Sequence, residues 1–104
     1  MTMLPFPLDF HERAKALGSS TLYEAAHLPC AVDSAIRPLF DGAFIAAPAY
    51  PLECSPGDNL GLHLAMERVP RGSALVVGTG AFIAGYWGEV LTVAAEAAGV
   101  VGLV

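Results

Sequence analysis

Charged side chains are scarce in this sequence. They make up 14% of its 104 residues, whereas about 25% is usual for a soluble domain. A chain of this size forms one domain with a modest core and much surface for its volume. The deficit therefore predicts that apolar surface is covered by something else. We expect both an oligomer interface and further chain that completes the core.

Positive charge is especially sparse, and this argues against a nucleic-acid-binding protein. The formal net charge is -5. Binding to nucleic acid requires a clustered positive surface. The five basic residues are instead scattered along the chain: Arg13, Lys15, Arg37, Arg68 and Arg71. We expect no nucleic-acid partner.

Cysteine pairs and long apolar runs are also missing. Cys30 and Cys54 form no CxxC pair, so we expect no disulfide framework. Two free thiols are consistent with the reducing environment of the cytoplasm. The histidines follow no metal-ligand spacing. The uncharged stretch 72–88 is interrupted by glycines, which argues against a membrane span. The N-terminus lacks the pattern of a signal peptide. These features predict a cytoplasmic protein with no membrane partner.

The first half of the chain predicts two short helices. Residues 8–17 form a helix that opens at Asp9 and closes at Gly18. Thr21 and Glu24 have the spacing of a capping box, which predicts a second helix from about residue 22 until Pro29. A turn is expected over residues 38–42.

The middle of the chain predicts a strand followed by a helix. Residues 43–54 are apolar and contain prolines, which favours an edge or bulged strand. A turn at 55–60 then leads into a helix capped by Asp58 or Asn59. The buried stripe of that helix has helical spacing: Leu62, Ala65, Met66 and Val69.

The last third predicts a right-handed strand–helix–strand unit and thus an α/β fold. Residues 73–78 resemble a strand covered on both faces, and residues 100–104 form another buried strand. The intervening helix ends at Gly99. Its apolar stripe is continuous: Trp87, Val90, Leu91, Ala94, Ala95 and Ala98.

The start of that last helix is the best candidate for a binding site. In "GAFIAGYWGEVL" (80–91), small residues precede a helix start whose first backbone N–H groups lack helical acceptors. These groups and the helix dipole suit a carboxylate or phosphate. A dinucleotide loop is the competing reading. However, "GTGAFIAG" (78–85) is too long for GxGxxG, and no acidic residue follows at the ribose distance.

Two segments carry a family resemblance. The runs "PGDNLGLHLAMERVPRGSALVV" (56–77) and "YWGEVLTVAAEAAGVVGLV" (86–104) resemble the RraA-like family, which includes 4-hydroxy-4-methyl-2-oxoglutarate/4-carboxy-4-hydroxy-2-oxoadipate aldolases. The likeness extends to "STLYEA" (20–25) and "IRPLFDGAFIAAPAY" (36–50). It implies a swivelling β/β/α domain over residues 1–104 that lacks its C-terminal half.

The resemblance also implies an activity and a site. The family's class II aldolases cleave 4-hydroxy-2-oxo acids to pyruvate, and oxaloacetate decarboxylation is related. The substrate-binding backbone corresponds here to Gly88, Glu89, Val90 and Leu91. An Arg-Asp pair that grips substrate and places Mg2+ would follow Val104, so this chain would hold no catalytic residue or metal ligand and would be inactive alone.

The resemblance leaves other roles open. It implies homotrimers or hexamers with a small 2-oxo acid bound between subunits. Some relatives are instead non-enzymatic regulators that bind a ribonuclease, and this is the alternative function. A third reading is a truncated product without activity. The aldolase is the leading hypothesis. Nothing in the residues selects the regulatory role, because members of a fold family do not all share a function.

Overall fold

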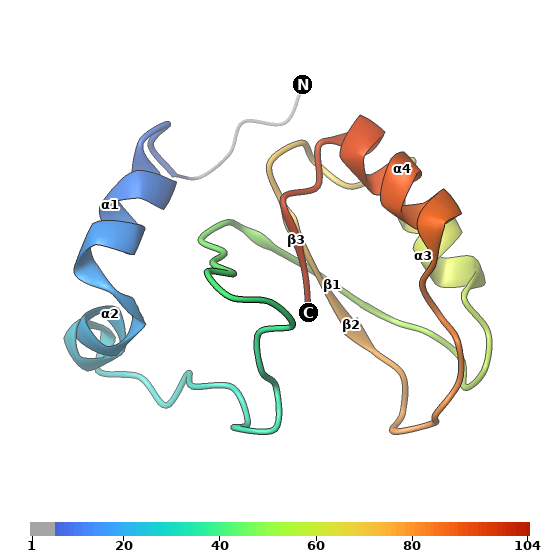
Figure 1. The fold of residues 1–104 in the computed structure, drawn as a ribbon, viewed down its shortest axis with the longest axis horizontal. Helices are drawn as coiled ribbons and strands as arrows, with labels where there is room; N and C mark the ends of the chain where they lie inside the picture. Colours follow the sequence, from blue (N-terminus) through green and yellow to red (C-terminus); the bar gives the residue numbers. More distant parts are fainter. Residues whose placement is uncertain (1–5) are drawn as a thin grey trace. The chain divides into compact units, whose positions relative to one another are not determined.

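The computed structural model describes residues 6–104 and divides into two units. Residues 1–5 of the predicted domain lie outside the described part. The first unit spans residues 6–46, and the second contains residues 47–104. Figure 1 shows the helices of the first unit in blue and the sheet of the second in green to red. The mixed α/β class predicted from the sequence is confirmed.

The first unit contains two short helices, α1 (Phe10–Leu17) and α2 (Ser19–Ala26). Gly18 separates them with a φ of 84°, a backbone conformation that glycine adopts without strain. The capping box predicted at Thr21 and Glu24 is wrong. Helix α2 begins two residues before Thr21, directly after Gly18, and it has no side-chain cap. Its end at His27 precedes Pro29, as expected from proline's missing N–H.

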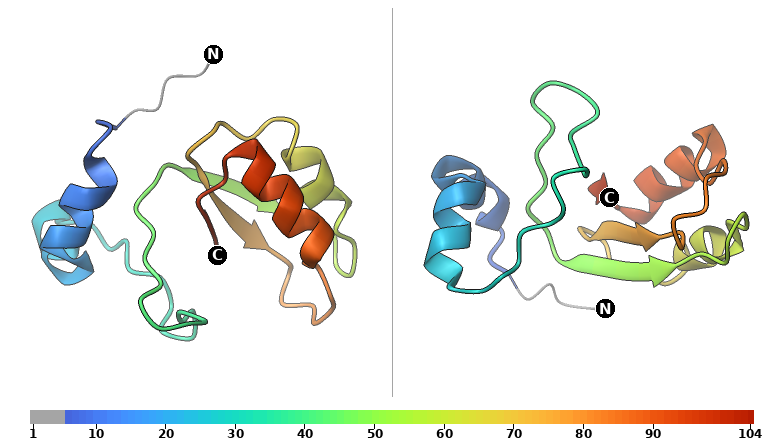
Figure 2. Two further views of the ribbon diagram at one scale, coloured as in Figure 1. Left: turned by 45° about the horizontal axis from the view of Figure 1, so that its top comes forward. Right: turned by 90° about the horizontal axis from the view of Figure 1, so that it is seen from below.

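The second unit is built on a parallel sheet of three strands in the order β1-β2-β3. These strands are β1 (Ala49–Glu53), β2 (Ala74–Gly78) and β3 (Gly102–Leu103). Helix α3 (Leu60–Ala65) connects the first two strands, and helix α4 (Glu89–Ala98) connects the last two. Figures 1 and 2 show both helices beside the sheet. The unit is therefore two consecutive βαβ units that share β2.

The first strand lies at the edge of the sheet, as its prolines predict. It begins only at Ala49, so the expected start at residue 43 is wrong. Pro48 accepts a hydrogen bond from Ala74, and Cys54 donates one to Gly78. In a parallel ladder, alternate residues bond to a given neighbour, so Pro51 directs its nitrogen to the open side. The proline therefore costs the β1–β2 pairing no hydrogen bond.

The core of this unit lies between the sheet and its two helices. Leu62 of α3 and Leu91 of α4 pack with Cys54, and all three are buried. Leu52 and Val77, from neighbouring strands, pack against this cluster. Both helices therefore cover the same face. The predicted stripe of α3 is confirmed: Leu62, Ala65 and Val69 are buried, and Met66 packs at the edge of the core.

Three expectations about burial and strand length are corrected. Val76 of β2 is 37% exposed, because both helices lie on the other face of the sheet. Val90 is 76% exposed, although it was predicted on the buried stripe of α4. Only a narrow face of α4 packs against the rest of the unit, and its buried residues are Leu91 and Ala95. The strand expected over residues 100–104 is shorter in the structure, where β3 contains only Gly102 and Leu103.

The C-terminal end of α4 is capped as predicted. Gly99 adopts a left-handed conformation, and its N–H bonds to the carbonyls of Ala95 and Glu96. Arg71 donates from Nη1 to the carbonyl of Ala97, 2.9 Å away. This contact satisfies one of the last carbonyls of the helix. The helix is thus held at the end opposite to the one that was predicted to bind a ligand.

Candidate functional site

A pocket lies where the loops after β1 and β2 meet the start of α4. Its volume is about 320 Å³. In parallel sheets, loops after the carboxyl ends of strands gather at one edge, which is where such folds bind ligands. The lining comes from α3, the loop before α4 and the first turn of α4: Asn59, His63, Gly85, Tyr86, Trp87, Gly88, Glu89, Val90 and Leu91.

The first turn of α4 brings unpaired backbone donors to this pocket. Gly88 is the N-cap residue, with an extended backbone (φ -158°), and its carbonyl accepts from the N–H of Thr92. Within residues 6–104, no acceptor takes the N–H groups of Gly88, Glu89, Val90 or Leu91. No side chain caps them either. The positive end of the helix dipole therefore remains available to an anion.

Trp87 forms a wall of the pocket and does not consume these donors. Its indole Nε1 donates to the hydroxyl oxygen of Thr92, 2.8 Å away. That hydroxyl in turn lies 3.1 Å from the carbonyl of Gly88 and donates to it. The ring also packs against the core. The tryptophan is thus both a packing residue and a pocket residue.

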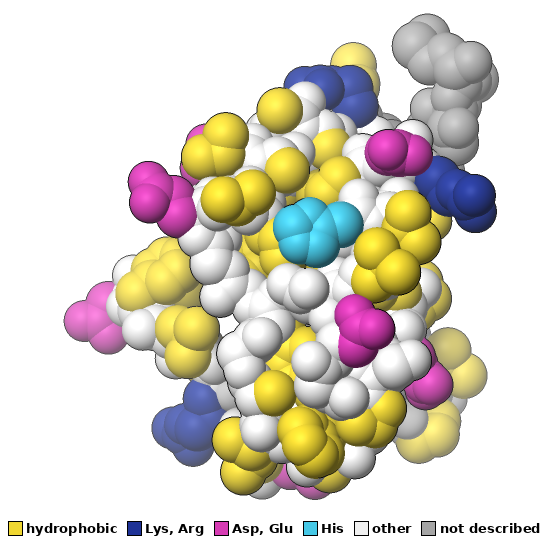
Figure 3. Space-filling view, turned by 90° about the vertical axis from the view of Figure 1, so that its right-hand side faces the viewer, with side chains coloured by type: hydrophobic (Ala, Val, Ile, Leu, Met, Phe, Trp, Pro, Cys, Tyr) yellow, Lys and Arg dark blue, Asp and Glu magenta, His cyan; other side chains and the backbone are white. Residues whose placement is uncertain are grey.

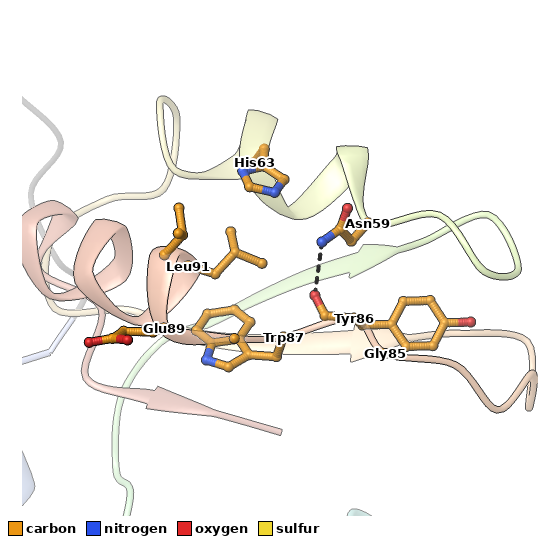
Figure 4. A pocket seen from close by; sticks show the side chains of 9 residues that line it. Asn59, His63, Gly85, Tyr86, Trp87, Glu89 and Leu91 are labelled. Atoms are coloured by element: carbon orange, nitrogen blue, oxygen red, sulfur yellow. Dashed lines mark hydrogen bonds between the residues drawn. The ribbon is translucent and has the colours of Figure 1, made fainter.

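Of the two residues predicted to cap α3, Asn59 occupies the N-cap position and Asp58 makes the side-chain hydrogen bond. Asn59 occupies the N-cap position of α3, but its side chain makes no cap bond there. Its Nδ2 instead donates to the carbonyl of Tyr86, 3.1 Å away (Figure 4). Asp58 accepts through Oδ1 from the N–H of Leu60 at 2.8 Å. Asn59 therefore connects the start of α3 to the loop that precedes α4.

Three ionisable side chains line the pocket: His63, Tyr86 and Glu89. His63 of α3 is exposed and lies above Leu91 in Figure 4. Figure 3, which views the side where Figure 1 draws α3 and α4, shows a histidine among hydrophobic side chains, with few basic groups nearby. The carboxylate of Glu89 points away from both Asn59 and His63 (Figure 4). The Glu89 carboxylate therefore does not point at the Asn59 and His63 side of the pocket.

The described residues do not form a divalent-metal site. No group of three or more His, Cys, Asp or Glu side chains gathers anywhere within residues 6–104. In the pocket, the side chains with suitable donor atoms are Asn59, His63 and Glu89, and Glu89 points away. A hard cation such as Mg2+ prefers several oxygen ligands. These residues alone do not fit the metal that the resemblance implies.

A family model matches most of this sequence. The sequence profile described as "RraA-like: Aldolase/RraA" matches residues 19–104. The chain belongs to the RraA-like family. No solved structure matches it. Within residues 6–104 of this RraA-like chain, no helix is long and apolar enough to cross a membrane.

The residues predicted to bind substrate in this RraA-like chain lie together on the pocket wall. Gly88, Glu89, Val90 and Leu91 all line it. Leu91 is nearly fully buried, so its side chain forms part of the floor and only its amide can serve a ligand. The binding of a 2-oxo acid there stays a prediction.

Two residues of the site were not singled out from the sequence. Thr92 anchors Trp87, and Tyr86 bonds to both loops around the pocket. The position of Thr92, four residues after the N-cap glycine, is a usable signal because a threonine there can reach back to the N-cap carbonyl. Tyr86 gives no such local signal, since its partner Gly57 is 29 residues away.

Proposed function

We propose that this chain is the oxo-acid-binding part of a class II aldolase that cleaves 4-hydroxy-2-oxo acids to pyruvate, with oxaloacetate decarboxylation as a related activity. The proposal extends the family membership to a specific chemistry. One observation carries it: the amides of Gly88–Leu91 have no acceptor among the described residues, and all four residues line one pocket. Such a cradle suits the carboxylate of a small oxo acid.

The size and polarity of the pocket support a small anion. About 320 Å³ is at the lower end of the range for small-molecule sites. The helix start supplies N–H donors, and Trp87 and Leu91 supply apolar walls. A carboxylate bound by several N–H groups is stabilised by charge-assisted hydrogen bonds, which are stronger than neutral ones. Pyruvate combines such a carboxylate with a short apolar end.

The amides can contribute to catalysis as well as to binding. Aldol cleavage and decarboxylation of such acids both pass through the enolate of pyruvate, in which negative charge increases near the carboxylate. N–H groups that hold the carboxylate beside this charge would stabilise it without reorganising during the reaction. The cradle of this chain would therefore orient the substrate and lower the energy of its enolate.

The remaining catalytic groups are not supplied by the described residues. In the resemblance, an Arg grips the substrate and an Asp places Mg2+, and neither has a counterpart within residues 6–104. A bound divalent metal would act as a Lewis acid toward the 2-oxo group. We therefore propose substrate binding as the contribution of residues 6–104, and assign turnover to groups outside them.

A matched pair of variants at Glu89 tests the cradle directly. Glu89 is the first helical residue, where proline is tolerated, and the extended Gly88 before it is compatible with a following proline. Glu89→Pro deletes one amide donor together with the carboxylate. Glu89→Ala deletes only the carboxylate. The difference between the two variants isolates the N–H group.

Binding is measured by titrating ¹⁵N-labelled protein with pyruvate and with acetone, which lacks the carboxylate. We expect pyruvate, and not acetone, to shift the amide signals of Gly88–Leu91. Glu89→Pro should bind pyruvate about tenfold more weakly than Glu89→Ala, as expected for one hydrogen bond to a charged group. Equal binding by the two variants, or equal shifts with acetone, would count against the proposal.

Catalysis requires a second experiment on a longer chain. A version that continues through the Arg-Asp pair should release pyruvate from a 4-hydroxy-2-oxo acid when Mg2+ is supplied. The corresponding Glu89→Pro variant should be slower than Glu89→Ala, because the amide acts on the enolate. Absence of pyruvate release by the longer protein would refute the aldolase assignment while leaving the binding result intact.

We also propose that the protein assembles into homotrimers or hexamers. Many large apolar side chains are exposed in the single chain, and Leu39 and Ile83 are almost fully exposed. Exposed apolar surface of this extent is typical of an interaction surface. Light scattering coupled to size-exclusion chromatography should give a trimeric or hexameric mass, and a monomeric mass at all concentrations would contradict this.

A further inference from the structure

The two loops around the pocket are connected mainly through Tyr86. Its phenolic oxygen accepts a hydrogen bond from the N–H of Gly57 at 2.9 Å. The same hydroxyl donates to the carbonyl of Phe82 at 3.0 Å. Gly57 belongs to the loop between β1 and α3, and Phe82 belongs to the loop between β2 and α4. One hydroxyl group therefore bridges both loops.

The backbone of Tyr86 makes a second connection between the same loops. Its carbonyl accepts from Nδ2 of Asn59 at 3.1 Å. The ring extends away from His63, while the carbonyl points toward Asn59 (Figure 4). Side chain and backbone of Tyr86 are thus both attached to the segment 57–59. This fixes the orientation of the Tyr86–Trp87 peptide, which directly precedes the cradle.

The loop before α4 needs such an attachment. Gly80 and Ala81 both have positive φ, and a β-carbon added at Gly85 would meet no atom within 4 Å. Within this loop, only one backbone–backbone hydrogen bond is found among the described residues, from Phe82 to Thr79. A loop with few internal bonds samples several conformations unless side chains order it.

Packing reinforces the bridge. A β-carbon added at Gly57 would lie 3.4 Å from a ring carbon of Phe82. The Phe82 ring therefore lies against the backbone of Gly57, next to the hydrogen bond that Gly57 donates to Tyr86. The left-handed conformation of Gly57 (φ 77°) allows this approach.

We propose that Tyr86 is a positioning residue, whose hydroxyl holds the loop before α4 so that the amides of Gly88–Leu91 converge on the pocket. The inference rests on the proposed function for its ligand, because the anion held is the carboxylate of a 2-oxo acid. The ordering of the ligand-free amides does not depend on that function. The tyrosine acts through the backbone and need not touch the anion.

Tyr86→Phe is the decisive variant, because it removes the hydroxyl and keeps the ring. Both backbone partners of the hydroxyl are exposed and can bond to water, so the fold should persist. Arg71→Met is the matched control. It removes a single hydrogen bond from a side chain to the carbonyl of Ala97, at the other end of the same helix.

Three measurements are made on each protein: thermal unfolding, ¹⁵N–¹H signals of Gly88–Leu91 without ligand, and the affinity for pyruvate. We expect Tyr86→Phe to shift and broaden the ligand-free signals and to weaken pyruvate binding about fivefold, because both hydrogen bonds of the hydroxyl that order the loop are lost. Arg71→Met should change neither the ligand-free signals nor the pyruvate affinity, even if it lowers the unfolding temperature as much as Tyr86→Phe does.

Two outcomes would overturn the inference. One is that Tyr86→Phe leaves both the ligand-free signals and the affinity unchanged. The other is that Arg71→Met alters them as much as Tyr86→Phe does, since general destabilisation would then explain both. If the unmodified chain binds no pyruvate, the proposed function fails, and the ligand-free signals still decide the role of Tyr86.

Discussion

The indole of Trp87 is attached to the helix that follows it: Nε1 donates to the hydroxyl oxygen of Thr92 across 2.8 Å. The hydroxyl of Thr92 in turn donates a hydrogen bond to the carbonyl of Gly88. The wall of the pocket and the N-cap of α4 are therefore fixed by one side chain. Because Trp87 is the only tryptophan in the sequence, tryptophan fluorescence reports on the environment of this indole alone.

Replacing Thr92 should release the indole. Thr92→Val keeps the branched shape and removes the hydroxyl. We expect a red-shifted and less anisotropic emission from Trp87, because the freed indole N–H turns to water. The free energy of unfolding should fall by about 1 kcal/mol, the net value of a typical hydrogen bond. Thr92→Ser, which retains a hydroxyl, should behave like the unmodified protein, and an unchanged emission in Thr92→Val would disprove the contact.

The charge of Glu89 should oppose anion binding while it stabilises the helix. It lies in the first turn of α4, where a negative charge interacts favourably with the helix dipole. Glu89→Gln should therefore lower stability by about 0.3 kcal/mol and tighten pyruvate binding at low salt. The increase in pyruvate affinity should become smaller as salt is added, since exposed charges are screened.

Glu96 provides the matched control for this charge effect. It lies near the C-terminal end of the same helix, where a negative charge is unfavourable. Glu96→Gln should raise stability slightly and leave pyruvate affinity unchanged. The diagnostic result is that Glu89→Gln lowers the unfolding temperature whereas Glu96→Gln raises it. The same sign at both positions would rule out the dipole explanation.

Leu91 and its neighbour Val90 should differ sharply in their contribution to stability. Leu91 is 2% exposed and packs in the core, whereas Val90 is 76% exposed. Leu91→Ala should cost about 2–4 kcal/mol through lost burial and the cavity left behind. Val90→Ala should change stability by less than about 0.5 kcal/mol. Urea unfolding of both variants measures these changes. A loss of stability in Val90→Ala similar to that in Leu91→Ala would show that Val90 belongs to the buried stripe of α4, as predicted from the sequence.

The glycines at the two ends of α4 should respond differently to alanine. Gly99 has a φ of 81°, and an added β-carbon would lie 3.0 Å from Arg71. Gly99→Ala should therefore destabilise the protein by about 1 kcal/mol or more. Gly88 is extended and open, so Gly88→Ala should have little effect on unfolding. Thermal denaturation distinguishes the two, and equal losses would contradict this account of the caps.

Local patterns predicted the elements of the second unit better than their extents. The edge position of β1 followed from its prolines, and the C-terminal end of α4 followed from Gly99. Trp87, which was predicted on the stripe of this helix, instead lies before its first residue. The burial of Val76 and Val90 was mispredicted because an apolar run does not reveal how many layers cover it. That depends on tertiary packing, which here places both helices on one face.

The candidate site was predictable where the signal was local. The helix start at Gly88 and the preceding small residues stand next to one another in sequence. The contacts of Tyr86 with Gly57 and of Asn59 with Tyr86 join residues 29 and 27 positions apart. No spacing rule finds such pairs. Oligomeric state, a cytoplasmic location and the alternative role as a ribonuclease-binding regulator stay predictions.

The placement of Pro51 gives the sheet a preferred direction of growth. Along the outer side of β1, the middle position of the strand offers no N–H to an incoming neighbour, so pairing there would be interrupted at its centre. No proline occurs in residues 100–104, which contain β3. Any additional strand, whether from this polypeptide or another, is therefore disfavoured beside β1 and directed to the flank formed by β3.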